Sequence, residues 1–158
     1  MISYVDLQFF WVGDSYIVKE LAILDDDLKL SHYIFAPPYS YSALSKGAKK
    51  QVSWMRHNYG SPCWNSGYIP YEHAKHIIQS ELVNSGAIYV KGLEKKKWLE
   101  KFNIFAINME DMDCKLKIKK LYKGPKCRQH ENIESVCALR NVFNFKEWLE
   151  NNICKNVK

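Results

Sequence analysis

Two cysteines and one histidine stand close together near the C-terminus, and their side chains are ones that bind zinc. Cys127 and His130 are separated by two residues, and Cys137 follows after six more. Zinc prefers sulfur and nitrogen ligands in tetrahedral sites, so this spacing favours a metal-binding corner that takes a fourth ligand from elsewhere in the chain. The same residues also suit buried cysteines and a histidine that caps a helix, because free cysteine is among the most buried residue types. The spacing by itself leaves both interpretations open.

A second group of residues has the chemistry to contact nucleic acid. Lysines cluster over residues 46–50, 91–101 and 115–126, and aromatic residues lie among them. Cations for phosphates together with rings for bases suit single-stranded RNA. The alternative is that the lysines keep helix surfaces soluble while Trp98 packs in the core. The residues that we predict to contact RNA are Lys91, Lys95, Lys96, Lys97, Lys119, Lys120, Lys123 and Arg128.

Length and composition limit the class of protein. The 158 residues, 47% of them hydrophobic and 14% aromatic, fit one folded domain over residues 1–158 and exclude a disordered chain. The formal net charge of +6 is compatible with a nucleic-acid partner but does not require one. An odd number of cysteines, and an N-terminus without the pattern of a secretory signal, indicate a cytoplasmic or nuclear protein. No apolar run approaches the ~18 residues that span a bilayer, so we expect no membrane partner.

Hydrophobic periodicity divides the chain into strands and helices. The predicted strands cover residues 2–12, 16–24, 28–35, 87–90 and 104–107. The predicted helices cover residues 42–58, 70–84, 93–102, 116–121 and 132–151. The Asp25-Asp26-Asp27 triplet is interpreted as a tight turn, and the last helix carries Ala138, Val142, Phe145 and Leu149 on one apolar stripe. An antiparallel meander followed by strand–helix alternation predicts an α/β fold with a mixed sheet flanked by helices.

This order of elements resembles the ribonuclease H-like fold, in the form that the DEDD 3′–5′ exonucleases use. Asp6-Leu7-Gln8 stands where those enzymes carry Asp-x-Glu. Residues 87–99 (AIYVKGLEKKKWL) resemble their second sequence block, and residues 136–142 (VCALRNV) resemble their third. The resemblance implies an RNase H-like mixed sheet that begins with an antiparallel three-stranded meander.

The residues at the catalytic positions of this resemblance differ from those of the enzymes. Hydrolysis by two metal ions needs carboxylates that hold the ions together. The resemblance places Gln8, Lys96 and Asn141 at three of the four carboxylate positions, and Val136 where the general-base histidine would stand. It therefore implies that the chain is not a metal-dependent exonuclease.

The cysteines and the histidine resemble a second signature, that of the Maelstrom domain. This domain is an RNase H-like relative that has lost the DEDD residues and carries a Glu-Cys-His-Cys zinc motif. Cys127, His130 and Cys137-Ala138-Leu139 look like its cysteine–histidine segment, and Lys19-Glu20-Leu21-Ala22 looks like the context of its glutamate. The resemblance implies a structural zinc ion (Zn2+) held by Glu20, Cys127, His130 and Cys137, with Cys114 as the rival of Glu20.

The Maelstrom resemblance also carries an expectation about function. It implies a domain that binds RNA, single-stranded by preference, with protein partners in the small-RNA (piRNA) silencing of transposable elements. Three alternatives stay open: a metal-independent single-strand RNA endonuclease without an assigned catalytic residue, a non-catalytic protein-interaction module, and a working exonuclease with a shifted alignment. Because no HMG box follows the last helix, we expect functions that need that module to be absent.

Overall fold

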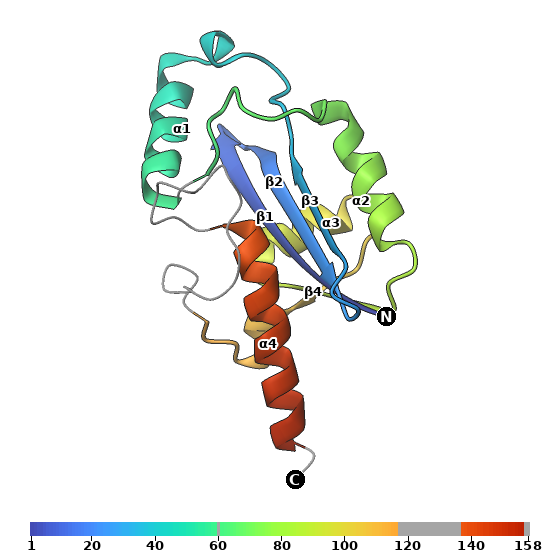
Figure 1. Cartoon of the computed structure of the whole chain (residues 1–158). Coiled ribbons are helices and arrows are strands. Elements are labelled where there is room, and N and C mark those ends of the chain that lie inside the picture. Colours follow the sequence, from blue (N-terminus) through green and yellow to red (C-terminus); the bar gives the residue numbers. More distant parts are fainter. Residues whose placement is uncertain (60, 117–136, 157–158) are drawn as a thin grey trace.

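The computed structural model describes residues 1–59, 61–116 and 137–156, of which residues 154–156 are described by their backbone alone. A five-stranded mixed sheet forms the centre of the structure (Figure 1). The strands lie in the order β3-β2-β1-β4-β5. The first three pair antiparallel, and the last two run parallel to β1. Their bounds are β1 Ile2–Val12, β2 Ser15–Asp25, β3 Leu30–Ile34, β4 Ala87–Val90 and β5 Ile107–Asn108. The predicted α/β fold with a mixed sheet is confirmed.

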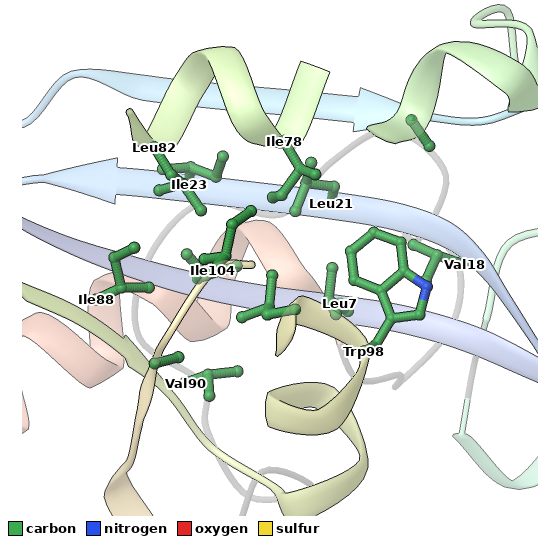
Figure 2. Packing of buried hydrophobic residues seen from close by; sticks show 14 of the residues in the cluster. Leu7, Val18, Leu21, Ile23, Ile78, Leu82, Ile88, Val90, Trp98 and Ile104 are labelled. Carbon is green, nitrogen blue, oxygen red and sulfur yellow. The ribbon is translucent and has the colours of Figure 1, made fainter. Parts of the chain in front are cut away.

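Helices cover both faces of this sheet because side chains alternate along β1 and β2. Even-numbered residues such as Tyr4 and Ala22 face α4 (Ala138–Asn156), which crosses one face of the sheet (Figure 1). Odd-numbered residues such as Leu7 and Leu21 face α2 (Ala74–Leu82) and α3 (Leu93–Glu100), as Figure 2 shows. The predicted stripe of α4 is confirmed, since Ala138, Val142, Phe145 and Leu149 are each at most 1% exposed.

A third hydrophobic cluster closes the end of the sheet beyond α4. Here α1 (Lys46–Tyr59) packs Val52 and Met55 against Phe10 of β1. Trp64, from the loop between α1 and α2, completes this cluster. Within the described residues, three short 3-10 helices link the larger elements: η1 Tyr41–Ala43, η2 Tyr71–His73 and η3 Met109–Met112.

Several predicted boundaries differ from the observed ones, each for a local reason. The third strand starts later than residue 28, because Asp25 accepts backbone hydrogen bonds from Asp27 and Lys29 and Leu28 is left-handed with φ 63°. This confirms the turn at the aspartate triplet. The predicted helix at 42–58 is split by the extended Leu44 into η1 and α1. The strand predicted at 104–107 is shorter and lies later, because only Ile107 and Asn108 pair with β4.

The end of the chain differs at Cys137, which the prediction placed inside the last helix. Cys137 instead directly precedes α4, and its carbonyl oxygen accepts the first helical hydrogen bond from the Asn141 N–H at 3.0 Å. The rest of the predicted start, residues 132–136, lies outside the described residues, as does nearly all of the helix predicted at 116–121.

A buried lysine at an irregularity of the sheet ties the loop around Trp64 to β2. The pairing of β1 with β2 shifts between Gln8 and Phe9, so that Lys19 has no partner residue on β1. Such a bulge redirects a side chain. Lys19 is fully buried, and its Nζ donates to the carbonyl oxygens of Phe35, Trp64 and Ser66 at 2.6, 2.8 and 2.5 Å. Burial disfavours the charged form and lowers the pKa of Lys19 to about 8, from 10.5.

This shift predicts a pH dependence of stability that belongs to Lys19 alone. Between pH 8 and 10.5 the folded chain binds fewer protons at Lys19 than the unfolded chain does. The free energy of unfolding should therefore rise with pH through this window relative to Lys19→Met, which has nothing to titrate there. Denaturant unfolding of both proteins from pH 7 to 10.5 measures the difference. A constant difference would mean that the pKa of Lys19 is not lowered.

Candidate functional site: buried charges beneath helix α4

A carboxylate at the centre of the sheet has both of its oxygens occupied by other side chains. Asp6 lies on the α4 face of β1 and is fully buried. Its Oδ1 accepts a hydrogen bond from Lys95 Nζ at 2.5 Å, and its Oδ2 accepts one from Asn141 Nδ2 at 2.7 Å. A buried charge is tolerated when it is paired and hydrogen-bonded. The Asp6 carboxylate meets this condition with an ammonium group and an amide.

Three separate elements bring these side chains together. Lys95 is in the first turn of α3, which follows β4, the parallel neighbour of β1. The turn into α3 uses Gly92 at φ 126°, and its N–H donates to Asn108 Oδ1. Asn141 lies one turn into α4. Although the two helices lie on opposite faces of the sheet, the Lys95 ammonium group on α3 contacts Asp6 on the α4 face.

The residue of α3 that contacts Asp6 is the neighbour of the one that the predicted alignment singled out. The exonuclease resemblance placed Lys96 at the second carboxylate position, but Lys95 is the residue that contacts Asp6, while Lys96 lies 3.9 Å from Glu100. The spacing of apolar residues along α3 could have predicted that Lys95 points inward. Lys95 stands three and four residues before Trp98 and Leu99, which are both buried, so all three share the inward side of α3.

A second buried carboxylate lies at the start of α4. Glu20 of β2 is fully buried, and its Oε1 is 2.8 Å from His32 Nε2 and 3.8 Å from Cys137 Sγ. Its Oε2 accepts a 3.5 Å contact from the backbone N–H of Ala138, the first residue of α4. Negative charge is favoured at a helix N-terminus, where N–H groups lack partners within the helix. Glu20 therefore joins β2, β3 and α4 at one point.

The donor atoms around Glu20 are those that zinc binds. A carboxylate oxygen and a sulfur on one tetrahedral zinc ion lie about 3.5 Å apart, given bond lengths of about 2.0 and 2.3 Å. Glu20 Oε1 and Cys137 Sγ are separated by a similar 3.8 Å. Two of the four predicted ligands are thus in contact. The other two, Cys127 and His130, lie outside the described residues. Within the part of the chain that is described, no group of three or more acidic, histidine or cysteine side chains is arranged to hold a metal ion.

Two further side chains, Cys114 and His32, bear on the predicted ligands. Cys114 is buried in the same hydrophobic cluster as Cys137, and its burial raises the pKa of the thiol. His32 was not predicted, although it shares a face of β3 with Ile34, the residue paired with Glu20. Alternation along β3 would have indicated His32 once the register of the β2–β3 hairpin was known.

The described lysines that we predicted to bind RNA, three on α3 and Lys91 in the turn before it, each have a carboxylate partner. Lys91 lies 3.5 Å from Glu110, and Lys97 lies 3.8 Å from Glu94. Lys96 and Lys95 contact Glu100 and Asp6, as above. Their contact with RNA stays a prediction, but the ammonium group of Lys95 is largely removed from solvent. The other predicted contacts, Lys119, Lys120, Lys123 and Arg128, lie outside the described residues.

Comparison with known proteins adds no assignment to this geometry. The chain matches no model of a known protein family, and a search of curated proteins finds no match either. Among the helices in the described ranges, none combines the length and apolar character needed to cross a membrane.

The Asp6–Lys95 pair predicts non-additive effects on stability. Asp6→Asn leaves a buried ammonium without its counter-charge, and Lys95→Met leaves a buried carboxylate without one, so each change should lower the free energy of unfolding by about 3–5 kcal/mol. The double variant has neither charge and should lose clearly less than the sum of the two. Denaturant unfolding of the four proteins gives the coupling energy. Additive losses would show that the two groups do not stabilise each other.

Proposed function

We propose that the chain is an RNase H-like domain of the degenerate DEDD type, stabilised by zinc, that binds single-stranded RNA. Three observations support the parts of this proposal. They are the topology of the sheet, the pairing of Asp6, and the contact between Glu20 and Cys137. The pairing of Asp6 is the strongest of the three observations, because it bears directly on whether the central site can bind divalent cations.

The sheet topology supports the RNase H-like fold. An antiparallel meander β1-β2-β3, with β4 and β5 added in parallel on the far side of β1, is the arrangement that the resemblance implies. In that fold the first strand and the last helix supply metal ligands at the centre of the sheet. Asp6 and Asn141 come from those two elements and lie in hydrogen-bond contact here.

The partners of Asp6 argue against hydrolysis by two metal ions. Such sites hold two divalent cations about 3.5–4 Å apart with several carboxylates. The Lys95 ammonium lies 2.5 Å from Asp6 Oδ1, where a metal ligand would be required, and the Asn141 amide presents its N–H to Oδ2. A divalent cation at Asp6 would meet a positive charge and a hydrogen-bond donor. The site therefore stabilises the fold by an internal ion pair.

The zinc part of the proposal assigns a structural role to the ligands around Glu20. Glu20 and Cys137, with Cys127 and His130, would hold the ion, and a bound zinc ion would cross-link β2 to the start of α4. The contact of His32 Nε2 with Glu20 would fix the orientation of that carboxylate. A closed site of this kind contributes to folding because metal binding and folding are coupled.

Metal analysis of variants tests this part. Wild-type protein should hold about one zinc ion per chain, Glu20→Gln and Cys137→Ser should lose it, and Cys114→Ser should keep it. His32→Gln should weaken zinc binding by about 10- to 100-fold, through loss of the contact that orients Glu20. Elemental mass spectrometry and titration with a zinc chelator measure these effects. A metal-free wild-type protein, or zinc lost from Cys114→Ser and retained by Glu20→Gln, would contradict the proposed ligands.

RNA binding rests on the net charge of +6 and on exposed aromatic residues among the cations. A setting in small-RNA silencing belongs to the proposal through the Maelstrom resemblance alone. The direct test is incubation of the protein with end-labelled single-stranded RNA, with Mg2+ and with EDTA. We expect salt-dependent binding and no Mg2+-dependent cleavage, because Lys95 opposes a divalent cation at Asp6.

Circular dichroism of the EDTA-treated protein is the control, since the chelator can also remove zinc. Cleavage that requires Mg2+ would overturn the assignment as a degenerate nuclease. Cleavage that resists EDTA would replace it with the metal-independent endonuclease. Absence of RNA binding at low salt would instead favour the protein-interaction module.

A further inference from the structure

The solvent face of α1 is basic without compensation. The helix carries Lys46, Lys49, Lys50, Arg56 and His57 and has no acidic residue. Among the residues that the structure describes, none of these five forms an ion pair with a carboxylate. Lys91 and the three α3 lysines differ, since each of these four predicted RNA contacts lies within 4 Å of a carboxylate oxygen. An unpaired cation attracts a phosphate more strongly than a cation already beside a carboxylate, because it has no counter-charge to lose.

Large aromatic side chains are exposed on the same helix. Trp54 is 56% exposed and Tyr59 is 42% exposed, and their rings meet edge to face at 5.7 Å between centroids. Trp54 follows Lys50 by four residues, so the two side chains are neighbours on the helix surface. An exposed indole beside a cation has the chemistry on which a nucleic-acid base stacks.

A pocket of about 390 Å3 opens on the other side of this basic face. Val52, Trp64 and Tyr41 provide its apolar surface, and Ser53, Arg56 and Asn65 provide hydrogen-bonding groups. This volume is within the range of small-molecule sites, about 300–1,000 Å3. At about 100° per residue, Lys46, Lys50 and His57 lie on the arc of the helix surface between the pocket side and Trp54. Two lysines and a histidine thus separate two places suited to aromatic rings.

The wall of the pocket is held in place by the sheet. Lys19 binds the carbonyl oxygens of Trp64 and Ser66, and Trp64 Nε1 donates to the Tyr39 carbonyl oxygen at 2.8 Å. The Trp64 ring also packs on Phe10 at 5.7 Å. These contacts anchor the loop from two directions. The pocket is therefore formed before any ligand binds, which lowers the entropy cost of binding.

We infer that α1 is the RNA-binding surface of this domain, with the phosphate backbone along Lys46, Lys50 and His57. One base stacks on Trp54, and another enters the pocket beside Arg56. This inference rests on the proposed function, since it identifies where the proposed single-stranded RNA binds. It also assigns the described α3 lysines to intramolecular pairs, so that α3 contributes little to RNA affinity.

Affinity measurements on matched variants test the surface. Trp54→Ala should weaken binding of a short single-stranded RNA by about tenfold or more. Lys46→Gln combined with Lys50→Gln should lower the salt slope, log Kd against log salt, by about 0.7 for each lost phosphate contact. Two controls should stay within about twofold of wild type. They are Phe105→Ala, an aromatic that is 78% exposed after α3, and Lys97→Gln, which removes a cation paired with Glu94.

The thiol of Cys63 provides a separate readout of the pocket. Cys63 is exposed, free and part of the pocket lining, so a bound base should shield it. Alkylation by iodoacetamide, followed by mass spectrometry of the Cys63 peptide, should be slowed several-fold by saturating single-stranded RNA. Heparin supplies negative charge without bases, and it should compete for the helix while leaving the alkylation rate unchanged.

The outcomes separate this inference from the proposed function. RNA binding by the wild type that is weakened by Lys97→Gln and not by the α1 variants would overturn the α1 surface and leave RNA binding standing. Unchanged Cys63 alkylation at saturating RNA, or equal protection by heparin, would overturn the base in the pocket. Undetectable RNA binding by the wild type would overturn the proposed function and this inference together.

Discussion

Packing of α4 on the sheet depends on the compensation of two buried carboxylates. Asp6 and Glu20 both lie on the face that this helix covers, and both are fully buried. An uncompensated carboxylate in such a place costs several kcal/mol, enough to cancel a large part of the stability of a small domain. The ammonium of Lys95 and the amide of Asn141 satisfy Asp6, and the imidazole of His32 and the first N–H of α4 contact Glu20. The apolar stripe of α4 can be buried only because these polar contacts form at the same time.

The same polar contacts also fix how the elements are placed. Hydrophobic burial is non-directional and tolerates small shifts of a helix along a sheet. A hydrogen bond from Asn141 to Asp6 and the contact of Ala138 with Glu20 do not, because they hold two points of α4 above two neighbouring strands. Lys19, which directly precedes Glu20 on β2, acts similarly, because its ammonium group binds three carbonyl oxygens from two loops. Charge in the interior thus selects one arrangement among several that would bury similar apolar area.

The sequence allowed the general architecture to be predicted, because periodicity reports which face of an element is buried. The stripe of α4, the meander and the parallel β4 were all visible in this way. The pairing of buried charges was less accessible, since it depends on how elements distant in sequence are aligned. The contact of Lys95 with Asp6 was not predicted, although Trp98 and Leu99 indicate that Lys95 lies on the inward side of α3. The contact of His32 could be predicted only from the register of the β2–β3 hairpin. The contacts of Lys19 depend on a bulge that hydrophobic periodicity does not indicate.

The pairing of Asp6 with Lys95 has a consequence for how such a site changes during evolution. A carboxylate introduced at position 95 alone would stand beside Asp6 in the protein interior, and like charges at that distance repel strongly. An acidic residue at position 141 would bring a second negative charge to a site that holds a single cation. Each single step toward a set of metal ligands therefore passes through a less stable protein, unless a divalent ion binds at once. An interior ion pair of this kind therefore tends to persist during evolution, because replacing its residues one at a time lowers the stability of the fold.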